Sequence, residues 1–462
     1  MNINFLNILL VLILVPLKNM AQVDSTTITY QEYIAAVLKF HPIAKKAELK
    51  IRQGDNALLS AKGNLDPTIS ANWDEKDFDD KLYYRRYNGK FIIPTKTGVD
   101  FVGGYENTDG TFLNPENNTD DYGLWNLGIE VNLLQGLLYN DRRAALDRAA
   151  EFQSLTINEQ NIILNELVYF ASKAYHEWQM WYFFENVLLE NISIANTYYE
   201  NTLASYQGGE KTTLDTLEAF IIYQDAQNIY NKNKTSLTRA KQNVENYLWF
   251  DFLPIKLSSL SKPENYANNF YDLSNALDLT QLVENHPIIK SYNNKKTIVE
   301  ISQRLKREKL KPKLKAKYNP LLSTGDNLIP EFAGYNQKFG IDFSMPLLFR
   351  SEKADVESDQ IKLEEIDYDL QNKRNDLTNK LEGSLENQMT IQDQIEIGKD
   401  VLQGYALLLE GENEKFKFGE SSVFMLNKRQ EKYINSQLKL IELNIKLQKE
   451  ILFFLFYSNS LL

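Results

Sequence analysis

Long stretches with an apolar residue at every third or fourth position dominate this chain. The longest covers residues 137–207 and contains neither glycine nor proline. At ~1.5 Å per residue, a helix of that length would run about 100 Å, whereas an average helix has roughly 11–12 residues. Residues 352–418 show a similar stripe without proline. Because helices this long must bury their stripes against other long helices, the pattern predicts antiparallel coiled coils.

Shorter helices are predicted on either side of these two stretches. Residues 29–63 form one helical run, broken at His41-Pro42, and residues 279–312 form another, broken at His286-Pro287. Two further helices follow the long ones, to about residues 249 and 457. Gly209 and Gly419 are suited to ending the long helices. Thr212 and either Ser421 or Ser422 are suited to capping the helices that follow.

Alternating apolar and polar residues predict short strands between the helices. The segments are 68–74, 99–105, 128–133, 313–318 and 338–345. In the last of them Phe339, Ile341 and Phe343 share one face, while Lys338 and Asp342 share the other. On pattern alone, an antiparallel sheet that covers a soluble core remains an alternative to a sheet that faces lipid.

The same succession of motifs occurs twice. The two His-Pro pairs lie 245 positions apart, and Pro67 and Pro312 keep that spacing. A strand that begins at Gly128 matches one that begins at Gly340, 212 positions later, so the first copy is longer in its strand region. A shared offset favours an internal repeat. We therefore predict a first repeat at 22–250, a linker at 251–276 and a second repeat at 277–462.

The N-terminal segment resembles a secretory signal. Residues 5–17 are a short apolar run, followed by a small residue, Ala21, at a plausible cleavage position. We expect residues 1–21 to be a signal peptide, with an uncleaved anchor as the alternative. No later stretch reaches about 18 consecutive apolar residues, so no helical membrane span is expected.

Composition narrows the function further. The net charge of −11 and the pI near 5.1 argue against a nucleic-acid-binding protein. Cysteine is absent, and His41, His176 and His286 are the three histidines. Each histidine is interpreted as structural, and the aromatic cluster at 178–184 as packing. Since no known catalytic, phosphate-binding or metal-binding motif is found, we expect no enzyme activity, no cofactor and no metal.

Taken together, these motifs resemble the outer-membrane efflux proteins, the TolC-like family. The resemblance covers residues 22–462 and rests on the His-Pro pairs, Pro67 and Pro312, the strands at Gly128 and Gly340, and Gly209 and Gly419. It implies a mostly helical fold with a small β-barrel portion and about four main membrane strands per chain. It also implies a homotrimer with a twelve-strand barrel, which the long helices extend across the periplasm.

The same resemblance places the candidate functional site at the two helix-hairpin tips. These would close the periplasmic mouth and contact an adaptor protein. The residues concerned are Gly209, Thr212, Asp215, Phe416, Gly419 and Ser421. In the family an acidic residue at the position of Asp215 joins a polar lock, whereas Asp215 could equally be an acid that stabilises a helix start. The second tip departs from the family, since Phe416 and Ser421 stand where tyrosine and arginine can complete the lock.

The working hypothesis is a passive outer-membrane exit duct, driven by an inner-membrane transporter and joined to it by a periplasmic adaptor. Such a duct would belong to an efflux pump or to a type I secretion system, would contact outer-membrane lipid and would bind no nucleic acid. A periplasmic coiled-coil scaffold or adaptor without a pore is the alternative, and an enzyme is a more distant one. Neither the exported substrate nor the resting state of the tips follows from the sequence.

Overall fold

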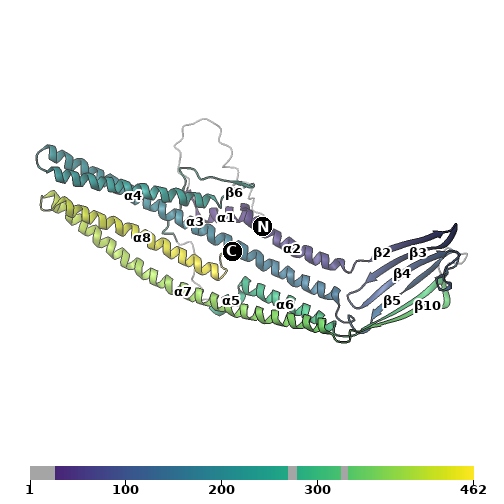
Figure 1. Ribbon diagram of the computed structural model, residues 1–462. Coiled ribbons are helices and arrows are strands. Elements are labelled where there is room, and N and C mark those ends of the chain that lie inside the picture. Colours follow the sequence, from purple (N-terminus) through teal and green to yellow (C-terminus); the bar gives the residue numbers. More distant parts are fainter. Residues whose placement is uncertain (1–26, 269–277, 324–330) are drawn as a thin grey trace, which may run out of the picture. The chain divides into compact units, whose positions relative to one another are not determined.

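A computed structural model describes residues 27–268, 278–323 and 331–462 (Figure 1). The predicted signal peptide at 1–21 and the end of the predicted linker therefore lie outside the described residues. No described helix combines the length and the apolarity needed to cross a membrane.

The described elements follow one another in two similar series. The first consists of α1 (Tyr30–Phe40), α2 (Pro42–Gly63), β2 (Thr68–Phe78), β3 (Lys81–Pro94), β4 (Val99–Asp109), η3 (Pro115–Asn117), β5 (Leu124–Asn132), α3 (Asp141–Gln207) and α4 (Thr213–Glu245). The second consists of α5 (Leu279–Asn285), α6 (Pro287–Glu308), β9 (Lys313–Ser323), β10 (Glu331–Ser344), α7 (Arg350–Lys417) and α8 (Val423–Tyr457). Four two-residue strands complete the set: β1 (Thr27–Ile28), β6 (Trp249–Phe250), β7 (Leu253–Pro254) and β8 (Lys262–Pro263).

The two long helices confirm the apolar pattern. α3 has 67 residues and α7 has 68, and each ends at the residue predicted or one residue before it. α3 begins four residues later than predicted, because Gly136 takes a positive φ of 86° and the chain turns there before the helix starts.

The described residues pack as two compact units. The described residues of the first unit are 27–36, 174–268 and 395–445, which include both hairpin tips. Those of the second unit are 37–173, 278–323, 331–394 and 446–462, which include the large sheet. In the second unit an apolar cluster forms from α5, α6, α7 and α8, with Val283, Ile289, Leu377, Leu381 and Phe454 buried at its centre.

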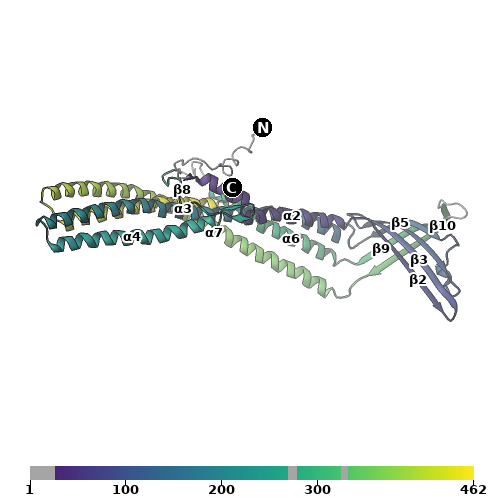
Figure 2. The ribbon, with the colours of Figure 1, turned by 90° about the horizontal axis from the view of Figure 1, so that it is seen from above.

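The large sheet is antiparallel and has six strands in the order β10-β9-β5-β4-β3-β2 (Figure 2). All five predicted strands are present and most are longer than predicted. β3 was not predicted, so the sheet exceeds the expected count of about four strands. The sequence of β3 does not alternate clearly between apolar and polar residues. Tyr83-Tyr84 and Arg85-Arg86 are pairs of like residues, and Gly89 interrupts the pattern.

The two faces of this sheet differ in chemistry. Cross-strand partners such as Phe343 and Leu314, or Ile129 and Tyr318, place apolar residues on one face. No other described residue shields much of that face: Ile69 is 84% exposed. The opposite face is polar and laced with ion pairs, which include Lys317–Asp342 at 2.6 Å. A sheet over a soluble core would bury its apolar face, so this arrangement disfavours the soluble alternative.

Candidate functional site

The first tip joins α3 to α4 in a tight turn. Gly209 has a φ of 80°, a conformation that favours glycine. Its N–H donates to the Tyr206 carbonyl at 3.0 Å, and the Glu210 N–H donates to the Ser205 carbonyl at 2.9 Å. These two bonds make a Schellman motif, which satisfies the last carbonyls of the helix. The sequence therefore located the end of α3 correctly through its glycine.

Thr212 and Asp215 then begin α4 with a capping box. The Thr212 side chain accepts from the Asp215 N–H at 3.2 Å, and the Asp215 carboxylate accepts from the Thr212 N–H at 2.9 Å. The Thr212 hydroxyl also donates to this carboxylate, at 2.8 Å. Hydrogen bonds from the backbone and then the side chain of Thr212 lower the pKa of Asp215. Within the described protomer, Asp215 thus acts on its own helix start.

The second tip repeats the turn with different side chains. Gly419 has a φ of 74°, and its N–H donates to the Phe416 carbonyl at 3.0 Å. Ser422, the later of the two predicted candidates, caps α8 by accepting from the Met425 N–H at 3.2 Å. Met425 holds the position that corresponds to Asp215, three residues after the cap. A capping box like that of the first tip therefore cannot form here.

Ser421 instead joins a small polar cluster that the sequence did not predict. Its hydroxyl donates to Glu412 on α7, and the Nε of Arg429 on α8 lies 3.5 Å from the same carboxylate. The hydrogen bond from Ser421 and the nearby Arg429 lower the pKa of Glu412. Glu412 and Arg429 lie 7 and 10 positions on either side of Gly419. That spacing across a hairpin turn was the available signal, because it brings both side chains to one level.

The two tips also touch each other through Phe416. The Lys211 ammonium lies 5.5 Å from the centre of the Phe416 ring, and the Tyr198 ring lies 6.2 Å from it. A cation over an aromatic face is attracted by the ring quadrupole. Although Phe416 cannot pair with a carboxylate, it thus links the first hairpin to the second by another kind of contact.

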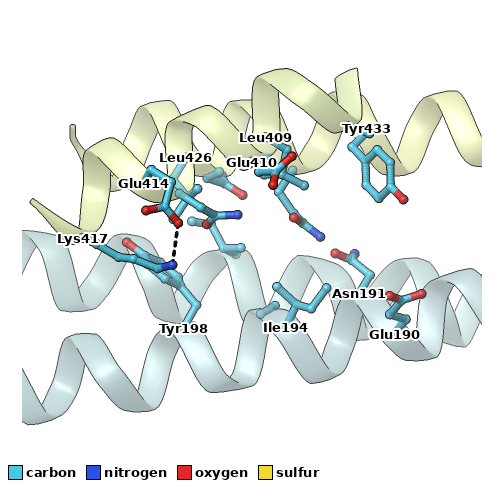
Figure 3. Close-up of a pocket in the computed structure, with 16 residues that line it drawn as sticks. Glu190, Asn191, Ile194, Tyr198, Leu409, Glu410, Glu414, Lys417, Leu426 and Tyr433 are labelled. Atoms are coloured by element: carbon cyan, nitrogen blue, oxygen red, sulfur yellow. Dashed lines mark hydrogen bonds and ion pairs between the residues drawn. The ribbon is translucent and has the colours of Figure 1, made fainter. Parts of the chain in front are cut away.

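A groove of about 630 Å³ opens beside this contact, between the two hairpins (Figure 3). Tyr198 and Ile194 line it from α3, and Leu409, Glu410 and Glu414 line it from α7. Burial raises the pKa of Tyr198 to about 12, so its hydroxyl stays protonated.

The charged groups of the groove are mostly acidic. Glu190, Glu410 and Glu414 contribute carboxylates, whereas Lys417 lies 2.7 Å from Glu414 and forms an ion pair with it. The groove therefore combines apolar surface with excess negative charge.

The histidines lie away from the tips and have structural contacts. His41 and His286 are the N-caps of α2 and α6, where each Nδ1 accepts a hydrogen bond from the N–H two residues later, at 3.2 and 3.1 Å. The buried His176 stacks on Tyr30 and lies 2.7 Å from the Gln179 side chain. Among the described residues no group of three or more His, Asp or Glu side chains is arranged to hold a metal ion.

The aromatic cluster of α3 packs against the segment that follows α4. Trp178 is buried against Tyr175, and Phe183 contacts Tyr266 edge to face, with ring centres 4.9 Å apart. The Tyr175 hydroxyl donates to the Ile28 carbonyl and accepts from the Glu264 N–H. These contacts fit the predicted packing role.

No protein-family model and no curated protein sequence matches this chain. Solved structures do. The Campylobacter jejuni CmeC outer membrane channel is 14% identical, with a TM-score of 0.65 over 93% of this chain and 85% of that one. For Vibrio cholerae VceC, an outer membrane protein, the identity is 12% and the TM-score 0.65, over 93% and 95% of the two chains. For the open state of the Neisseria gonorrhoeae MtrE outer membrane channel they are 12% and 0.64, over 93% and 88%. This chain has the TolC-like fold of the outer-membrane efflux channels.

Proposed function

We propose that this protein is an outer-membrane exit duct that carries substrates passively from a periplasmic adaptor complex to the exterior. The observation that carries the proposal is the exposed apolar face of the six-stranded sheet, opposite a face of ion-paired polar residues. Apolar-out and polar-in is the pattern of a β-barrel wall in lipid. The fold shared with outer membrane channels supports the same assignment.

A single copy cannot form such a wall alone. Its sheet ends at β2 and β10, and an open edge in lipid would leave backbone groups without partners. We therefore propose a homotrimer whose sheets join into one barrel. The duct would draw no energy from nucleotide, since the driving force would come from an inner-membrane transporter.

The tips are the proposed periplasmic gate and adaptor contact. Gly209 and Gly419 would shape the turns, while Thr212, Asp215 and Ser421 would fix the helix ends that meet the adaptor. The groove beside Phe416 offers apolar surface with excess carboxylates, so an adaptor helix with apolar and basic residues would complement it.

Reconstitution into planar bilayers tests the duct directly. The purified protein should migrate as a heat-modifiable trimer and should conduct ions in discrete steps. Replacing Phe339, which lies near the middle of β10 on the exposed apolar face, with lysine should impair insertion, because a charge toward lipid costs about 2–4 kcal/mol near the bilayer midplane. The matched control is an Asp342→Asn variant on the polar face, which should insert. A monomer that extracts into buffer without detergent would instead favour the periplasmic scaffold.

A further inference from the structure

We infer that the β3–β4 hairpin is part of the pore wall, so that a closed trimer has about 18 strands rather than twelve. This inference rests on the proposed duct function. Three copies of a six-stranded sheet supply that number, which lies within the known range of membrane barrels. The hydrogen-bond register, the two faces of the hairpin and the direction of the strands support this strand number.

The register shows that the hairpin is built into the sheet. β2 pairs with β3 from Thr68↔Ile92 to Phe78↔Lys81, with one irregularity. β3 pairs with β4 without a break, and β4 pairs with β5 from Val99↔Val131 to Glu106↔Leu124. Among the described strands of this sheet, β2 pairs with β3 alone. If the hairpin lay outside the wall, β2 would have to pair with β5 instead.

The hairpin also continues both faces of the sheet. Phe91 and Phe101 carry the apolar face across β3 and β4, where they are 42% and 51% exposed. On the polar face Lys90 of β3, whose partner on β4 is Gly104, reaches Glu130 of β5 at 3.1 Å. A flap lying against a narrower barrel would cover one of these faces and would not need this alternation.

Adding two strands does not change the direction of the other strands or of their connections to the helices. β2 still leaves α2, and β5 still leads into α3, so both connections remain at the helical end of the sheet. With six antiparallel strands the two edges run in opposite directions. β10 of one copy can therefore join β2 of the next in the antiparallel manner that membrane barrels require.

The two edge strands are long, and each pairs with its inner neighbour with a single register irregularity, between Lys76 and Asp77 in β2 and between Phe332 and Gln337 in β10. β2 has 11 residues and β10 has 14, and neither contains proline. Free edges of that length pair readily with other chains, and soluble sheets normally keep them short or interrupt them with proline. At a tilt near 45°, strands of about 9–11 residues suffice to cross a bilayer.

The consequence is a wider exit. Because barrel diameter grows roughly in proportion to strand number, 18 strands give a diameter about 1.5 times that of twelve strands and a cross-section about 2.2 times as large. Barrels of 16–18 strands leave an aqueous channel. Bulky hydrophilic solutes could then leave through the membrane segment.

Disulfide mapping can test which strands are neighbours, since the natural chain has no cysteine. An Ala71→Cys change on β2 is combined with cysteine at Phe339, Ile341 or Phe343 on the same face of β10. Mild oxidation should give covalent dimers and trimers for at least one pair. The control combines Ala71→Cys with Ile129→Cys on β5 and should give no bond within a chain. A bond in that control would overturn the inference, because it would place β2 beside β5.

Polymer exclusion provides an independent measurement. Deleting residues 81–109 leaves β2, β5, β9 and β10, which can make a twelve-strand barrel. With polyethylene glycols added on the exterior side, the natural channel should admit polymers of about 1.5-fold larger radius than the deletion variant. Equal cut-offs from a conducting variant would overturn the inference but not the duct. If the natural protein neither conducts nor forms oligomers, the proposed function fails as well; if only the deletion variant fails to fold, the disulfide pairs still decide.

Discussion

The two hairpin tips share a backbone and differ in their side chains. Both use a glycine of positive φ in a Schellman turn and a hydroxyl cap three residues later. The first tip then closes on itself through Thr212 and Asp215. The second is tied to its flanking helices through Glu412, Ser421 and Arg429. Glycine therefore determines the turn in both tips. The nearby charged residues determine which helices each tip stabilises: α4 at the first tip, and α7 and α8 at the second.

The N-caps of α2 and α6 give a second comparison, and it carries the largest expected effect. His41 and His286 cap their helices alike. Burial and the nearby Lys373 lower the pKa of His286 to about 4. In the unfolded chain the imidazole of His286 would take up its proton near pH 6.5. The free energy of unfolding should therefore be highest above pH 6.5, fall as the pH drops toward 4 and level off below pH 4. The total loss should be roughly 3 kcal/mol.

Replacing His286 with asparagine should flatten this dependence, because asparagine still caps a helix but does not titrate. Thermal unfolding in detergent between pH 4 and 7.5 would measure the change. The matched His41→Asn variant serves as the control for losing a capping histidine. If the natural protein and the His286→Asn variant show the same slope, the acid sensitivity belongs to another group.

The two tip glycines should respond almost equally, because a Cβ at either Gly209 or Gly419 would meet nothing within 4 Å. Alanine at either position should cost about 1–2 kcal/mol through its backbone conformation alone. Hydrogen exchange of the amides at 198–220 and 408–430 would report each tip separately. A much larger loss at one tip would mean that a neighbouring copy packs against that glycine.

Phe416→Leu should have a smaller effect, about 0.5–1 kcal/mol, because it removes the contact with the Lys211 ammonium while keeping apolar volume. Faster amide exchange is expected in both tips, since the contact joins them. Phe416→Tyr is the conservative control and should retain the cation–π contact. Faster exchange in the second tip alone would contradict a link between the hairpins.

Asp215→Asn should give the smallest change, a modest local loss confined to the start of α4. The pKa of Asp215 is lowered in the folded chain, so its contribution is present above about pH 4 and lost as the pH falls through its folded pKa. Exchange of the first α4 amides at pH 7 and at pH 3 would show this. A Met425→Asp change offers the reciprocal test, since it should build a capping box in the second tip.

Features fixed by local backbone chemistry were predictable from the sequence. The long helices, both His-Pro breaks and both glycine turns came from spacing and residue type. The resemblance to TolC-like proteins agrees with the solved structures that share this fold.

β3 was missed because its paired aromatics and arginines conceal a period of two. Glu412 and Arg429 were missed because their contact depends on the level at which two antiparallel helices face each other. The tandem repeat and the gate role of the tips remain predictions.

The seam between β5 and β9 has a consequence for the chain as a whole. It joins the two series of elements by a shared ladder, and on its polar face Lys315 also binds Glu130. Either series alone would leave the strand edge at this seam unpaired. Cutting the backbone in the segment between α4 and α5 would therefore leave two fragments that are mutually dependent. Produced together, they should reassemble as a complementation pair.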